Sequence, residues 1–104
     1  HVQNWDANDL LSKIATWQSN DISIGPRYKG DIKYALQSIR ARSILIPCTQ
    51  DLYFPPEDNA AEIQHIPNGE LRTYNSPWGH CVANPGNDPG FEVALDKSIH
   101  DLLE

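Results

Sequence analysis

One continuous run of apolar residues, SILIPC at Ser43–Cys48, most constrains what this chain can fold into. Such a run is typical of a β-strand that is covered on both faces, as in a parallel sheet. A second stretch, ELRTYNS at Glu70–Ser76, alternates in polarity and predicts a half-exposed strand. Two strands leave one side of the first strand without a neighbour, so the sequence predicts part of a larger α/β sheet.

Four segments have the apolar spacing of helices. The first follows Asp6 or Asn8, either of which suits an N-cap, and the second follows Asp31. The last predicts an amphipathic helix with one apolar stripe, formed by Phe91, Leu95, Ile99, Leu102 and Leu103. The predicted helices are Asp6–Gln18, Gly30–Ile39, Pro55–Ile66, which starts at two prolines, and Pro89–Glu104. The helix between the two strands predicts a right-handed parallel crossover.

Charge and composition exclude several classes of partner. The net charge is −6 and no run of Lys or Arg occurs, which argues against nucleic acid and against an anionic membrane surface. No apolar run approaches the ~20 residues of a membrane span, and the first residues lack the pattern of a signal peptide. Cys48 and Cys81 are too few for a disulfide framework, so a cytoplasmic location is expected. A single disulfide between them stays open; otherwise both are expected to be buried, inert thiols.

Each predicted strand runs into a loop that presents one ionisable residue. Asp51 lies three residues past Cys48, and His80 lies four residues past Ser76. The carboxyl ends of parallel strands meet at one edge of a sheet, where functional groups gather in open α/β folds. A carboxylate that accepts from one imidazole nitrogen fixes the tautomer and leaves the other nitrogen to take a proton. Gly79 would let the backbone turn tightly before His80.

Simpler interpretations of these residues stay open at this point. A loop aspartate after a strand is commonly a turn residue or a helix cap, and a lone histidine is commonly structural or solvated. A metal site built from Cys48, Asp51, His80 and Cys81 lacks any C-x-x-C or H-x-x-x-H spacing, so no metal is predicted.

Two motifs in this order resemble a known family. From Asp6 onward the chain is similar to the last third of the homoserine O-acetyltransferase family, which has the α/β-hydrolase fold; the matching stretches include GDIKYALQSIRARSILIPCTQDLYFPPEDN and IPNGELRTYNSPWGH. The resemblance implies that Asp51 is the acid and His80 the base of a catalytic triad, whose chain order is Ser, Asp, His. It also implies that the chain is the C-terminal part of an α/β-hydrolase fold, with its last two parallel strands and flanking helices, and a fragment of a larger domain.

The nucleophile is missing from these residues. No G-x-S-x-G occurs, and none of the serines follows an apolar strand at a turn into a helix. The resemblance therefore places the serine upstream, and the chain alone is expected to be inactive. In the family the triad histidine is followed by an aspartate that meets the amino group of the substrate, whereas Cys81 stands here, which argues against homoserine. An acyltransferase or esterase with another acceptor is expected; the alternative is a non-catalytic binding or assembly module.

The resemblance also divides the chain and suggests its partners. Residues 1–30 are predicted to form a lid-type helix and linker, and residues 31–104 the strands and helices of the hydrolase core. Tyr53 and Trp78 flank the presumed acid and base and, with Cys81, are the candidate substrate-binding residues. The expected partners are a small-molecule acyl donor and acceptor and the remainder of the domain, with a homodimer left open. No cofactor is expected, and acyl-CoA would serve only as a donor substrate.

Overall fold

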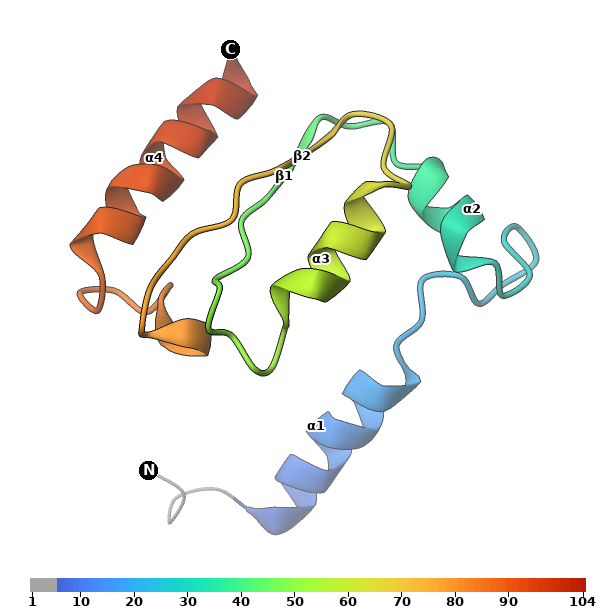
Figure 1. Cartoon of the computed structure of the whole chain (residues 1–104). Helices are drawn as coiled ribbons and strands as arrows, with labels where there is room; N and C mark the ends of the chain where they lie inside the picture. Colours follow the sequence, from blue (N-terminus) through green and yellow to red (C-terminus); the bar gives the residue numbers. More distant parts are fainter. Residues whose placement is uncertain (1–5) are drawn as a thin grey trace. The chain divides into compact units, whose positions relative to one another are not determined.

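The computed structural model describes residues 6–104, which divide between Ile32 and Lys33 into two compact units. Within the described residues the order is helix, helix, strand, helix, strand, short 3-10 helix and helix (Figure 1). This order agrees with the one predicted from the sequence. Residues 1–5, the start of the predicted lid-type segment, lie outside the described residues.

The first unit contains helix α1 (Ala7–Ser19) and a turn-rich segment. Asp6, rather than Asn8, is the N-cap, because its carboxylate accepts from the amide of Asn8 at 2.7 Å. No residue of α1 is buried, and the Trp17 side chain is exposed. After the helix, Asp21 accepts from both the amide and the hydroxyl of Ser23, which is buried in a local turn.

The second unit is built around two parallel strands, β1 (Ser43–Leu45) and β2 (Gly69–Leu71). Ser43 pairs with Gly69 and Leu45 with Leu71, so the predicted parallel pairing is confirmed. Both strands are shorter than predicted, since Pro47 has no N–H to donate. Hydrogen bonds nevertheless continue the pairing, from Tyr74 N to Pro47 O at 2.8 Å and from Thr49 N to Tyr74 O at 2.9 Å.

The burial predicted for the first strand is not found. Ser43, Ile44 and Leu45 are all half-buried, whereas a strand covered on both faces was expected. The backbone bonds to β2 come from Leu45, Pro47 and Thr49, so the alternate residues Ile44 and Ile46 direct their backbone groups to the other edge. Within the part of the chain that the structure describes, the sheet has two strands and nothing pairs with that edge.

Three further helices complete this unit. Helix α2 (Ile32–Gln37) begins directly after Asp31 and buries Ala35 and Leu36. Helix α3 (Pro56–Ile63) starts at a proline, as predicted, and packs on β2. Helix α4 (Pro89–Leu103) packs on β1, so that the two strands lie between α3 and α4 (Figure 1).

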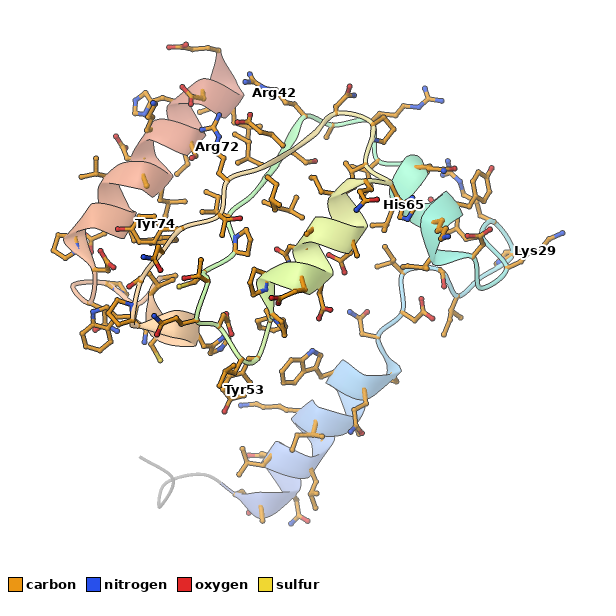
Figure 2. The ribbon with its side chains drawn as sticks, in the orientation of Figure 1. Lys29, Arg42, Tyr53, His65, Arg72 and Tyr74 are labelled. Atoms are coloured by element: carbon orange, nitrogen blue, oxygen red, sulfur yellow. The ribbon has the colours of Figure 1, made fainter. Side chains whose placement is uncertain are left out.

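The predicted helix α4 is found, but its apolar stripe is not buried among the described residues, except at Phe91. The buried residues of the helix are Phe91 and Ser98. The other four residues of the stripe are between 37% and 80% exposed: Leu95, Ile99, Leu102 and Leu103. The physical reason is an ion-pair cluster. Arg72, the residue after β2, lies beside α4 (Figure 2) and donates to Ser98 at 3.1 Å and to Asp101 at 2.7 Å, so polar residues of the helix face the strand.

A small apolar core lies next to the ends of the strands. Cys48, Val82 and Phe91 are buried together, with Ile46 and Tyr74 packed against them. The rings of Tyr74 and Phe91 meet edge to face, with centroids 5.3 Å apart. Phe91 therefore attaches the first turn of α4 to both strands.

We predict that Phe91→Ala destabilises the protein by about 3 kcal/mol, because it leaves a cavity in this core. Val93→Ala is the matched control on the same helix, since Val93 is 70% exposed and should change stability little. Urea unfolding of both variants measures the difference, and equal losses would show that α4 does not depend on this core.

Candidate functional site

The loop after β1 is shaped by Asp51. Its amide donates to Cys48 O, and its carboxylate oxygen Oδ1 accepts from the amides of Tyr53 at 2.8 Å and Phe54 at 3.0 Å. Asp51 is therefore a turn residue, as the simpler interpretation expected. Only one carboxylate oxygen is used in this way, so Oδ2 remains for a second partner.

The loop after β2 turns back at Gly79, which starts the 3-10 helix η2 (Gly79–Cys81). Gly79 has a φ of +51°, a conformation that favours glycine. A Cβ atom here would lie 2.5 Å from the backbone oxygen of Gln50, the residue before Asp51. The positive φ and the close approach to Gln50 thus each require glycine at this position. The absence of a side chain lets the loop after β2 contact the loop after β1.

These two loops bring the predicted pair together. His80 Nδ1 lies 3.2 Å from Asp51 Oδ2, within hydrogen-bonding distance. The Asp51 side chain is 12% exposed and that of His80 is 44% exposed, so a half-buried carboxylate faces a more exposed imidazole. With Nδ1 on the carboxylate, Nε2 is the nitrogen that can exchange a proton with solvent or a reactant.

Two aromatic rings pack on the imidazole. The centroid of His80 lies 4.5 Å from that of Tyr53 and 5.4 Å from that of Phe54. Of the three candidate substrate-binding residues, the structure thus places Tyr53 in contact with His80, while Trp78 and Cys81 are exposed near it in sequence. The contact of Phe54 was missed from the sequence, although its place three residues after Asp51 was a signal for it.

The electrostatics of Asp51 favour the carboxylate. Burial raises its pKa, but the amides of Phe54 and Tyr53 and the nearby His80 outweigh burial, and the net pKa lies below the ordinary value. Asp51 is therefore ionised at neutral pH and able to accept from Nδ1–H.

A hollow of about 360 Å³ adjoins this pair. Asp51 and His80 contribute its polar groups, and Ile46 at the free edge of β1 contributes to its apolar wall. The remaining lining residues come from the strand end, α3, α4 and the loops: Pro47, Cys48, Phe54, Asn59, Val82, Ala83 and Phe91.

A hydrogen-bonded network at the base of the histidine loop was not predicted. The Ser76 hydroxyl, in a residue only 1% exposed, donates to Asp88 Oδ2 at 2.6 Å. Asp88 Oδ1 accepts from the amide of Phe91 and from the Tyr74 hydroxyl, so Asp88 is also the N-cap of α4. The hydrogen bonds from Ser76 and Phe91 hold the pKa of Asp88 below its ordinary value. Burial, and then the hydrogen bond to Asp88, raise the pKa of Tyr74.

The two cysteines differ in exposure. Both cysteines are free; Cys48 is buried as expected, whereas Cys81, the last residue of η2, is exposed. Among residues 6–104, no group of three or more metal-ligating side chains is found. No helix in the same residues is long and apolar enough to cross a membrane.

An aspartate and a histidine in contact at the carboxyl ends of parallel strands, with helices on either side, make the chain α/β-hydrolase-like. Comparison with known proteins agrees. The chain is 33% identical to a probable esterase of Corynebacterium glutamicum over 95% of its own length, and 34% identical to ethyl acetate hydrolase of Pseudomonas veronii over 94%. It is 29% identical to homoserine O-acetyltransferase of Trichormus variabilis over 76%.

A solved structure is similar as well. The crystal structure of an acetylester hydrolase from Corynebacterium glutamicum matches 94% of the chain with a TM-score of 0.76 and 32% identity. No protein-family model matches the chain. The chain spans 28% and 27% of the lengths of the first two relatives and 27% of the solved structure, about a quarter of each. The similarity therefore supports a hydrolase-like or acyltransferase-like function at a coarse level.

We predict that Gly79→Ala destabilises the protein by more than about 2 kcal/mol, because strain at positive φ adds to a backbone clash that cannot swing aside. Gly86→Ala is the matched control, since Gly86 has a φ of +83° but open space around its Cβ position, and should cost about 1 kcal/mol. Chemical unfolding measures both, and equal losses would show that the contact with Gln50 is unimportant.

The lowered pKa of Asp51 predicts a pH dependence. Its carboxylate stabilises the fold above the unfolded pKa of about 3.9, and this contribution is lost as the pH falls through the lower pKa of the folded state. The difference in unfolding free energy between the wild type and Asp51→Asn should therefore shrink as the pH falls from neutrality to about 3. Parallel curves in urea unfolding at each pH would contradict the assigned contacts.

Proposed function

We propose that Asp51 and His80 are the acid and the base of a Ser-His-Asp triad in an ester-hydrolysing enzyme. The observation that carries this proposal is the 3.2 Å contact between His80 Nδ1 and Asp51 Oδ2, at the shared carboxyl edge of two parallel strands. The similarity to esterases along nearly the whole chain supports it.

In the proposed mechanism the contact between Asp51 and His80 serves both halves of a serine esterase reaction. Asp51 accepts from Nδ1–H and keeps the imidazole in the tautomer whose Nε2 is a base. Nε2 takes the proton of the serine hydroxyl while the serine oxygen attacks the ester carbonyl, and His80 then returns this proton to the departing alkoxide. In the second half, His80 deprotonates water, which attacks the acyl-enzyme, and the serine leaves with the proton. The carboxylate of Asp51 stabilises the imidazolium in both halves.

The serine and the oxyanion hole are proposed to lie in a part of the protein outside these residues. The chain has no G-x-S-x-G motif and covers about a quarter of the relatives that it resembles. The free edge of β1 offers the backbone groups of Ile44 and Ile46 to another parallel strand. Ile46, the residue after β1, and His80 both line the hollow, so an added strand is proposed to end near His80.

Hydrolysis is favoured over acyl transfer. The two esterases match 95% and 94% of the chain, whereas homoserine O-acetyltransferase matches 76% at a lower identity. Cys81, exposed after His80, has no full charge with which to bind an ammonium group. We therefore propose water as the acceptor and a short acetate ester as the substrate, with no cofactor; acyl-CoA would be needed only for transfer.

Acyl transfer is the second candidate, because one stretch of 57 residues is 44% identical to a probable acyltransferase of Methanothermobacter thermautotrophicus. The two candidates share Asp51 and His80 and differ in the acceptor. An excess of a small alcohol would divert the acetyl group to a new ester in a transferase and would leave acetate as the main product in an esterase.

We predict that the full-length protein is labelled by a fluorophosphonate serine probe and hydrolyses p-nitrophenyl acetate. His80→Ala should abolish labelling, and Asp51→Asn should lower kcat roughly 10⁴-fold, as expected when the imidazole loses its orienting carboxylate. His100→Ala on the exposed face of α4 is the matched control and should be fully active. Activity that survives His80→Ala would refute the triad, and a stable protein without labelling would favour a non-catalytic module.

A further inference from the structure

We propose that Asp88 and Ser76 are positioning residues that hold the His80 loop against Asp51. This proposal rests on the proposed function only for its catalytic consequence. The two side chains are hydrogen-bonded to each other, and they lie at the two ends of the segment that carries His80.

Ser76 is the point at which this segment is anchored. It is 1% exposed, and its backbone oxygen accepts from Gly79 N at 3.4 Å and from the Cys48 thiol at 3.4 Å. Its hydroxyl accepts from Trp78 N at 3.3 Å while donating to Asp88. The backbone from Ser76 to Gly79 is therefore fixed just before His80 and tied to the end of β1.

Asp88 fixes the other end of the segment. Its Oδ1 binds the amide of Phe91 and the Tyr74 hydroxyl, at 3.0 Å and 3.1 Å, and its Oδ2 binds Ser76. One carboxylate thus joins Tyr74 in the segment after β2, the start of the histidine loop and the first turn of α4. The first turn of α4 lies close to the Tyr74 ring: a Cβ atom at Gly90 would lie 2.7 Å from the Tyr74 hydroxyl oxygen.

The path from the bonded Ser76–Asp88 pair, named the clamp, to the imidazole is short. The backbone oxygen of Ser76 accepts from Gly79 N, and Gly79 lies against the backbone oxygen of Gln50, the residue before Asp51. Loss of the Ser76–Asp88 bond would free the turn to move away from Gln50, and the contact between His80 and Asp51 would lengthen. A misplacement of about 1 Å can cost on the order of 10² in rate.

The competing explanation is that Asp88 only caps α4. Ser76→Ala separates the two, because it removes the bond to Asp88 and leaves the bonds of Oδ1 to Phe91 and Tyr74. Asp88→Asn is the second variant, since asparagine caps helices as well as aspartate does, but an NH2 group at the Oδ2 position removes the charge and makes the Ser76 hydroxyl an acceptor in place of a donor. Ser98→Ala is the matched control: Ser98 is also a buried serine, bonded to Arg72 and Ala94, away from the histidine loop.

The first readout does not depend on activity. In the full-length protein labelled with ¹⁵N-histidine, the imidazole nitrogen shifts of His80 report the tautomer that Asp51 selects. Ser76→Ala and Asp88→Asn should move these shifts toward those of Asp51→Ala, and Ser98→Ala should leave them unchanged. Unchanged shifts in both clamp variants would overturn the proposal.

The second readout is the hydrolysis of p-nitrophenyl acetate by the same variants. Ser76→Ala and Asp88→Asn should lower kcat by about 10-fold to 100-fold with KM within about twofold, because the base is displaced and the substrate site is kept. A rise in KM at constant kcat would contradict a role in positioning the base. If His80→Ala leaves kcat intact, the proposed function fails, and the nitrogen shifts still decide whether the clamp holds the imidazole.

Discussion

The parallel pairing of β1 with β2 is the constraint on which the site depends. It sends both loops out at one sheet edge, and the hydrogen bonds up to Thr49 and Tyr74 keep the two backbones paired almost to the site. The final approach is made by Gly79 against the Gln50 oxygen, where any larger residue would push the loops apart. The contact between His80 and Asp51 is thus a consequence of backbone packing as much as of attraction between the side chains.

Local signals predicted most of this fold. Caps and prolines marked the helices, and two strands joined by a helix predicted the parallel pair. The face of α4 could not be predicted from its own residues, because the partner that selects the face, Arg72, lies on another element. The sequence placed Asp51 and His80 at one edge, but it could not reveal the bond between Ser76 and Asp88, since a serine and an aspartate twelve residues apart carry no periodic signal.

Asp51 is a turn residue in the structure, and its second carboxylate oxygen is free for the triad role proposed above. Oδ1 shapes the turn through the amides of Tyr53 and Phe54, and Oδ2 faces His80. The same turn brings the rings of Tyr53 and Phe54 onto the imidazole. One loop therefore supplies the carboxylate and two packing surfaces, so a change in the turn would disturb all three contacts with His80 at once.

The solvent exposure of His80 limits how firmly Asp51 alone can orient the imidazole. A pair in which one member is 44% exposed is screened by water, so attraction to Asp51 is too weak to fix the imidazole by itself. Its orientation must come from restraints that solvent does not weaken, namely the glycine contact, the aromatic rings and the buried Ser76. The further strand proposed for the free edge of β1 would exclude water from the pair and strengthen its electrostatics, which is how it would make His80 a stronger base.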